Sequence, residues 1–182
     1  INIAAGPYLG IFAIICFGIM LVAPEVLTIL APADYWSGKI IIPPIVIASL
    51  LMFLASIGID LEYYAKRTRH IAANTIIAAI VNIVLNLVFI PKYGAVAAAY
   101  TTVVSYMISF IMHYHMSRKI EKSLFPIKIF IMPFTVALLG ASATYMFMDN
   151  VVIRYALATV AVPCILLLLR KYRDRNMEQG AE

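Results

Sequence analysis

The chain has 182 residues, of which 64% are hydrophobic and 13% are charged, and its mean hydropathy is +0.96. A soluble domain carries about 25% charged residues, because it needs a polar surface against water. The composition therefore excludes an ordinary soluble domain and predicts an all-α membrane protein that crosses the bilayer several times. The net charge is +5, but the basic residues stand in short clusters between apolar runs, which is typical of membrane topology and not of nucleic-acid binding.

Six apolar runs have the length of transmembrane helices, about 20 residues or roughly 30 Å each. The predicted spans cover about residues 4–30, 40–59, 71–90, 95–116, 126–148 and 151–169. Together they form one six-helix lobe over residues 1–170, followed by a charged tail at 171–182. The segment between the first two spans, 31–39, holds Tyr35 and Trp36, and we expect it to be an interfacial loop.

The third and fourth spans are joined by a connection too short for anything but a tight turn, so they form a helical hairpin. Pro91, Tyr93 and Gly94 belong to this turn. Pro lacks a backbone N–H, and Gly reaches positive φ at little cost. A small-residue patch, 140–144, lies in the fifth span.

The basic residues are unevenly divided between the two sides of the membrane. Eleven of the 14 fall on one side, and only Lys39, Lys92 and Arg154 fall on the other. The positive-inside tendency makes the side with eleven cytoplasmic, so both ends of the chain lie in the cytoplasm and the membrane is the inner, cytoplasmic one. An even number of spans with both ends inside is typical of one lobe of a two-lobed transporter, with 6+6 or more helices. The chain begins abruptly at Ile1 beside an apolar run, so we expect a missing N-terminal lobe to precede it.

Polar side chains inside the spans are candidates for a substrate path or for packing between helices. The candidates are Asn74, Asn82, Asn86, Thr101, Ser105 and His113. The asparagines either line a polar path or hydrogen-bond to a neighbouring helix. The fourth span carries small residues four apart at Ala97, Thr101, Ser105 and Ser109, a stripe that suits packing against the third span.

Titratable residues lie near the ends of the spans. His113 is either a proton-sensitive group or an interfacial residue. Glu25 and Asp60 sit at the ends of runs and are interpreted as interfacial. Cys16 and Cys164 lie within apolar runs and are interpreted as buried thiols.

The sequence contains no motif for covalent chemistry. There is no HExxH, no Gly-rich phosphate loop and no GxSxG. His113 and His115 are two apart and cannot share a helix face, which argues against a paired metal site. We therefore expect no enzyme activity, no catalytic or metal-binding residues and no cofactor.

The hairpin sequence IAANTIIAAIVNIVLNLVFIPKYGAVAAAYTTVVSYMISF resembles the corresponding hairpin of polysaccharide and O-antigen export flippases. These flippases belong to the multidrug/oligosaccharidyl-lipid/polysaccharide exporter superfamily. The matching positions are Asn82, Leu85, Asn86, residues 90–94, Ala98, Ala99, Thr102 and Ser105. LVAPEVLTILAPADYW also resembles the exit from the first helix of the family's C-terminal half, so the resemblance covers about residues 21–118.

The resemblance implies two six-helix lobes that face each other across a cavity, with this chain as the C-terminal lobe. It implies movement of a polyprenyl-diphosphate-linked oligosaccharide across the membrane by alternating access, in polysaccharide biosynthesis for the cell envelope. The implied partners are the lipid-linked sugar, membrane lipids and the N-terminal lobe. Two alternatives remain open: a cation-coupled multidrug exporter of the same superfamily, and a non-transporting membrane scaffold of glycan assembly.

Overall fold

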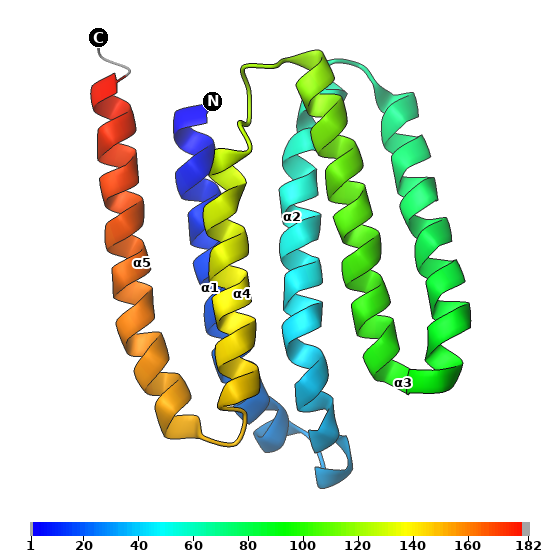
Figure 1. Ribbon diagram of the computed structural model, residues 1–182, viewed down its shortest axis with the longest axis vertical. Helices are drawn as coiled ribbons and strands as arrows, with labels where there is room; N and C mark the ends of the chain where they lie inside the picture. The colour runs from blue at the N-terminus through cyan, green and yellow to red at the C-terminus, as the bar shows by residue number, and fades with distance from the viewer. Residues whose placement is uncertain (1, 180–182) are drawn as a thin grey trace. The chain divides into compact units, whose positions relative to one another are not determined.

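A computed structural model describes residues 2–179, and the side chains of residues 5–163, 165, 167 and 170. The described chain is helical from end to end and contains no β-strand in that range, which confirms the all-α prediction (Figure 1). The elements are α1 (Asn2–Leu30), the 3₁₀ helix η1 (Ala33–Ile41), α2 (Ile42–Tyr64), α3 (Thr68–Ile120), α4 (Lys128–Met146) and α5 (Val151–Gln179).

Several helices are long and apolar enough to cross a bilayer, which is consistent with the predicted membrane class. Among the described residues these segments are 5–30, 33–64, 68–120 and 128–146, and a shorter apolar stretch covers 151–163. The longest, α3, has 53 residues and is interrupted at Gly94, where φ is 60° and ψ is −146°. Figure 1 shows α3 folding back at this point, so it consists of a first arm, 68–93, and a second arm, 95–120. Such a backbone conformation is open to Gly because it has no Cβ.

The segment predicted as an interfacial loop, 31–39, is instead largely helical. Pro32 precedes the first turn of η1, and its carbonyl accepts a hydrogen bond from the Tyr35 N–H at 3.0 Å. Trp36 Nε1 donates to the Ala31 carbonyl at 3.1 Å, and Lys39 Nζ lies 5.8 Å from the centre of the Trp36 ring. These contacts within residues 31–39 stabilise the helical turns. Apolar periodicity alone does not reveal such local contacts.

The boundary expected between the last span and the charged tail is not a helix end. The backbone of α5 continues through 169 to Gln179. The side chains of the predicted tail, and that of Cys164, lie outside the described residues.

The helices fall into two compact units, which are described separately: unit 1 comprises 1–43 and 126–182, and unit 2 comprises 44–125. In unit 1, α1 packs against α4 and α5 around a core that includes Ala13, Phe17, Leu21 and Val136. A Cβ built on Gly140 would lie 2.9 Å from Phe17 Cδ2, so the small residue lets α1 and α4 approach closely. Cys16 is buried in the same unit, as predicted.

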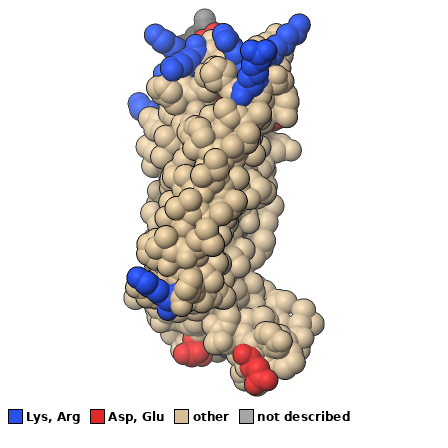
Figure 2. Space-filling model, turned by 90° about the vertical axis from the view of Figure 1, so that its right-hand side faces the viewer, with Lys and Arg blue, Asp and Glu red and all other residues tan. Residues whose placement is uncertain are grey.

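Unit 2 is formed by α2 and the two arms of α3. The first arm leaves most of its apolar side chains exposed, among them Ile76, Ile83 and Leu87, the last at 72%. Such exposure is unfavourable in water but suits a helix whose surroundings are lipid tails. The face shown in Figure 2 likewise has a broad uncharged middle, with most of its Lys and Arg side chains at one end and fewer charged side chains at the other.

Candidate functional site

The second arm of α3 carries a longer stripe of small and polar residues than the sequence indicated. Six residues at intervals of four are all buried: Ala97, Thr101, Ser105, Ser109, His113 and Ser117. Four residues exceed one helical turn by about 40°, so the stripe winds around the arm. It therefore contacts the first arm near the turn and α2 near the far end.

A chain of hydrogen bonds joins the two arms near the turn. Thr101 Oγ1 donates to Asn86 Oδ1, and Asn86 Nδ2 donates to Asn82 Oδ1 at 3.0 Å. Of the two interpretations left open for the asparagines, this arrangement supports packing between helices for Asn86. The single hydroxyl proton of Thr101 is shared between Asn86 Oδ1 and the Ala98 carbonyl of its own helix, which lies at 3.0 Å.

A cavity of about 520 Å³ lies between α2 and the two arms of α3. Polar groups line it from both arms, including Asn82 and Ser105, whereas α2 contributes apolar side chains such as Met52 and Ala55. Asn82 and Ser105 stand near the middle of their arms, so the cavity lies about halfway along the helices. Its lining contains no charged residue.

The remaining predicted residues lie outside this cavity. Asn74 is buried on the first arm, at 8% exposure, and does not line it. In the turn, Pro91 lies inside the helix and Gly94 makes the reversal. Tyr93 is 65% exposed and stacks on Phe89, with ring centres 6.4 Å apart.

A second polar contact in unit 2 was missed by the sequence analysis. His113 Nδ1 lies 2.7 Å from Glu62 Oε1, and both side chains are fully buried. His113 is therefore buried inside the unit, against α2. A Cβ on Gly58 would lie 3.1 Å from His113 Cβ, so this glycine lets α2 approach close enough for the pair to form. The sequence signal that could have indicated this contact is the spacing of Gly58 and Glu62, which are four apart and share one face of α2.

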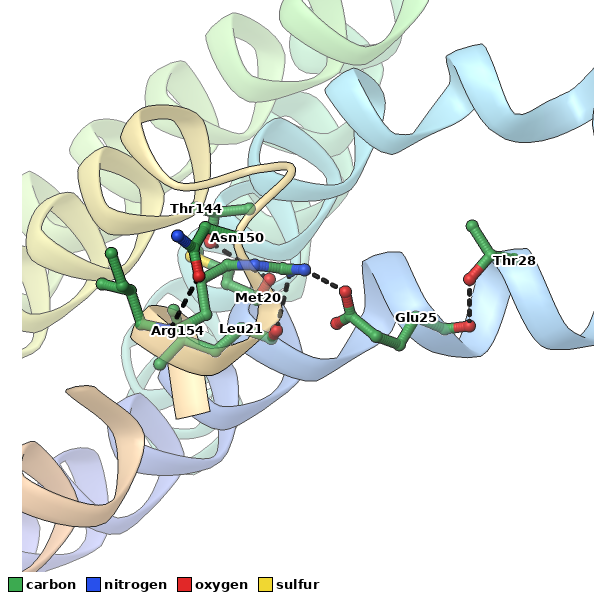
Figure 3. A network of polar contacts seen from close by, with 8 residues as sticks. Met20, Leu21, Glu25, Thr28, Thr144, Asn150 and Arg154 are labelled. Atoms are coloured by element: carbon green, nitrogen blue, oxygen red, sulfur yellow. Dashed lines mark hydrogen bonds and ion pairs between the residues drawn. The ribbon is translucent and has the colours of Figure 1, made fainter. Parts of the chain in front are cut away.

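Unit 1 contains a polar network around Pro24 (Figure 3). Proline has no N–H, so Pro24 leaves the Met20 carbonyl without its helical donor. The hydroxyl proton of Thr144, on α4, is shared between this carbonyl, at 3.1 Å, and the Gly140 carbonyl of its own helix, at 2.8 Å. The contact between α1 and α4 thus compensates for a defect that the proline creates.

Arg154, near the start of α5, completes the network. Its Nη1 donates to the Leu21 carbonyl at 3.0 Å, and its Nη2 pairs with Glu25 Oε1. The Arg154 side chain is fully buried and Glu25 is 17% exposed. Arg154, which the charge count placed on the side with few basic residues, is therefore paired within the unit, and Glu25 has a defined partner. The sequence separates the two residues by 129 positions, so no local pattern links them.

The polar groups of both units suit hydrogen bonding more readily than metal binding. Among the residues that the structure describes, no cluster of three or more His, Cys, Asp or Glu side chains could hold a metal ion. Comparison with protein-family models, with curated proteins and with solved structures finds no match for this chain.

Proposed function

We propose that this chain is the C-terminal six-span lobe of a flippase that moves a polyprenyl-diphosphate-linked oligosaccharide across the cytoplasmic membrane. The observation on which the proposal rests is the resemblance of residues 21–118 to polysaccharide export flippases. In this proposal the protein is a transporter and not an enzyme, and it works with a second lobe by alternating access.

The uncharged polar cavity of unit 2 supports a transport role. Polar side chains are costly at membrane depth, and transporters place their binding groups near the middle of the bilayer. In this proposal the two arms of α3 span the bilayer, so the cavity of about 520 Å³ lined by Asn82 and Ser105, about halfway along the arms, lies at that depth. Sites for small ligands typically measure about 300–1,000 Å³, so the cavity is large enough for part of a substrate.

The fold-back of α3 supports six spans with both chain ends on the cytoplasmic side. Counting each arm of α3 as one span and α5 as another brings the four apolar segments to six. In unit 2, the basic residues concentrate at the end of α3 away from the turn: Lys66, Arg67, Arg69, Arg118, Lys119 and Lys122. Lys92 is the one basic residue of unit 2 that lies beside the turn, which supports the charge asymmetry used to assign the cytoplasmic side.

The test is deletion of the gene in a strain that has no second transporter of this class. Lipid-linked oligosaccharide on the outer leaflet would be measured in intact cells with a membrane-impermeant glycosidase. We expect the sugar lipid to accumulate out of reach of the enzyme, and a plasmid copy of the full-length gene to restore access.

Normal access in the deletion strain would refute the proposal. Increased sensitivity to cationic drugs with normal access would instead favour a multidrug exporter. Reporter tags on the two ends of the chain provide an independent check, because tags found in opposite compartments would contradict six spans.

A further inference from the structure

The cavity between α2 and the arms of α3 offers a specific set of hydrogen-bonding groups. Ser105 Oγ donates to the Thr101 carbonyl at 2.8 Å, Thr102 Oγ1 to the Ala98 carbonyl at 2.7 Å, and Thr75 Oγ1 to the Ile71 carbonyl at 2.9 Å. Each hydroxyl uses its single proton within its own helix. The three oxygens therefore face the cavity as acceptors.

Asn82 supplies the opposite capacity. Its Oδ1 accepts from Asn86 Nδ2, and the Asn86 side-chain oxygen accepts from Thr101. This leaves the two N–H groups of Asn82 Nδ2 as donors, and they have no acceptor in the part of the chain that the structure describes. The cavity thus combines an amide donor with several hydroxyl groups, of which those of Tyr106 and Ser109 can also donate.

A ligand that matches this set must both donate and accept hydrogen bonds and must be uncharged. An anionic phosphate would meet no Lys, Arg or His in the lining, so its charge would stay uncompensated. A cationic group would meet no carboxylate there. A sugar ring fits, because each of its hydroxyls is both a donor and an acceptor. The apolar side chains of α2, including Met52 and Ile59, suit the C–H face of such a ring.

We propose that this cavity binds an uncharged sugar ring of a glycolipid, with Asn82 Nδ2 donating to a ring hydroxyl and Ser105 Oγ accepting from another. The identity of the natural ligand rests on the proposed function. The inference adds that unit 2 recognises the sugar of this ligand, whereas the diphosphate is held elsewhere. Ring and lipid tail arrive together from the bilayer, so the ligand needs no aqueous route to this depth.

Binding would be measured on the full-length protein in lipid nanodiscs, by native mass spectrometry during titration. The probes are monohexosyl diacylglycerol, diacylglycerol with the same acyl chains, and phosphatidic acid. We expect the hexosyl lipid to bind more tightly than the other two. Asn82→Leu should raise its Kd by about 2- to 12-fold, the range for one lost hydrogen bond, and leave the other two lipids unaffected.

Ser105→Ala provides a second variant in case Asn82→Leu disturbs the hairpin. Its matched control is Ser49→Ala, since Ser49 Oγ makes the same type of bond to the Ile45 carbonyl, at 3.0 Å, but is exposed outside the cavity. Ser105→Ala should weaken hexosyl-lipid binding at least twofold and Ser49→Ala should not. Equal affinity for the three lipids, or unchanged binding in both cavity variants, would overturn the proposal.

The two proposals fail in different ways. If binding depends on the sugar and is lost in Asn82→Leu, but export is normal in the deletion strain, the flippase function is refuted and the sugar site is supported. If export depends on the gene, but substitutions of Asn82 and Ser105 do not change hexosyl-lipid binding, the flippase function is supported and the sugar site is refuted.

Discussion

The hydrogen bond from Thr144 to the Met20 carbonyl makes a quantitative prediction about Pro24. Thr144→Val keeps the shape of the side chain and removes its hydroxyl. Gly140, whose carbonyl also accepts from Thr144 at 2.8 Å, retains its donor within α4. Met20 retains none, because Pro24 has no N–H to offer. The variant therefore leaves one buried carbonyl unpaired.

Measured hydrogen bonds between membrane helices average about 0.6 kcal/mol and reach about 1.7 kcal/mol. An unpaired buried acceptor in proteins costs about 1–3 kcal/mol. We therefore expect Thr144→Val to lower the free energy of unfolding by about 1 kcal/mol. Reversible unfolding of the purified protein in mixed micelles with increasing SDS, followed by circular dichroism, would measure this change.

A double-mutant cycle with Pro24→Ala tests the cause. Alanine restores an N–H for Met20, so Thr144→Val should cost less than half as much in the Pro24→Ala background as in the wild type. The matched control is Thr135→Val, because Thr135 bonds only the Ile131 carbonyl of its own helix and is exposed; its cost should stay within about 0.5 kcal/mol. Equal costs of Thr144→Val in the two backgrounds would refute the reasoning.

Three further predictions use the same unfolding measurement. Gly58→Ala should cost about 1–3 kcal/mol because its Cβ would meet the His113 carbonyl at 3.1 Å. The control Gly18→Ala, whose Cβ would have nothing within 4 Å, should be neutral or stabilising by up to about 1 kcal/mol, and equal effects of the two variants would contradict the close approach at Gly58. Gly94→Ala should cost about 1–3 kcal/mol because φ is 60° there, and an unchanged stability would mean that the turn is made differently. Glu62→Leu and His113→Leu should each cost about 3–5 kcal/mol, since each leaves its partner buried alone, and the double variant should be close to wild type; additive losses would argue against the pair.

The sequence was most informative where apolar length or a single special residue decides the outcome. Long apolar runs predicted the helices, and Gly94 marked the reversal within α3. Small residues at intervals of four predicted the buried face that contains Thr101 and Ser105. These features are local, so composition and helical periodicity are enough to find them.

Features that depend on contacts between distant residues could not be predicted in this way. Glu62 lies beyond the predicted second span, 40–59, and only the closeness of α2 to His113 reveals its burial. The pairing of Arg154 was not predicted, because its partner Glu25 lies far away in the chain. For the same reason, the cavity itself was not predicted, although two of its residues, Asn82 and Ser105, were.

The closed hydrogen-bond chain within α3 has a consequence for how the protein enters the membrane during synthesis. Inserted alone, the first arm would leave the Asn86 side-chain oxygen in hydrocarbon without a donor from the second arm. The second arm supplies this donor, which is the Thr101 hydroxyl. In the proposed six-span topology, Lys92 is the single charge beside the turn that crosses the bilayer with the pair. The translocon would therefore release the two arms into lipid together more readily than one after the other.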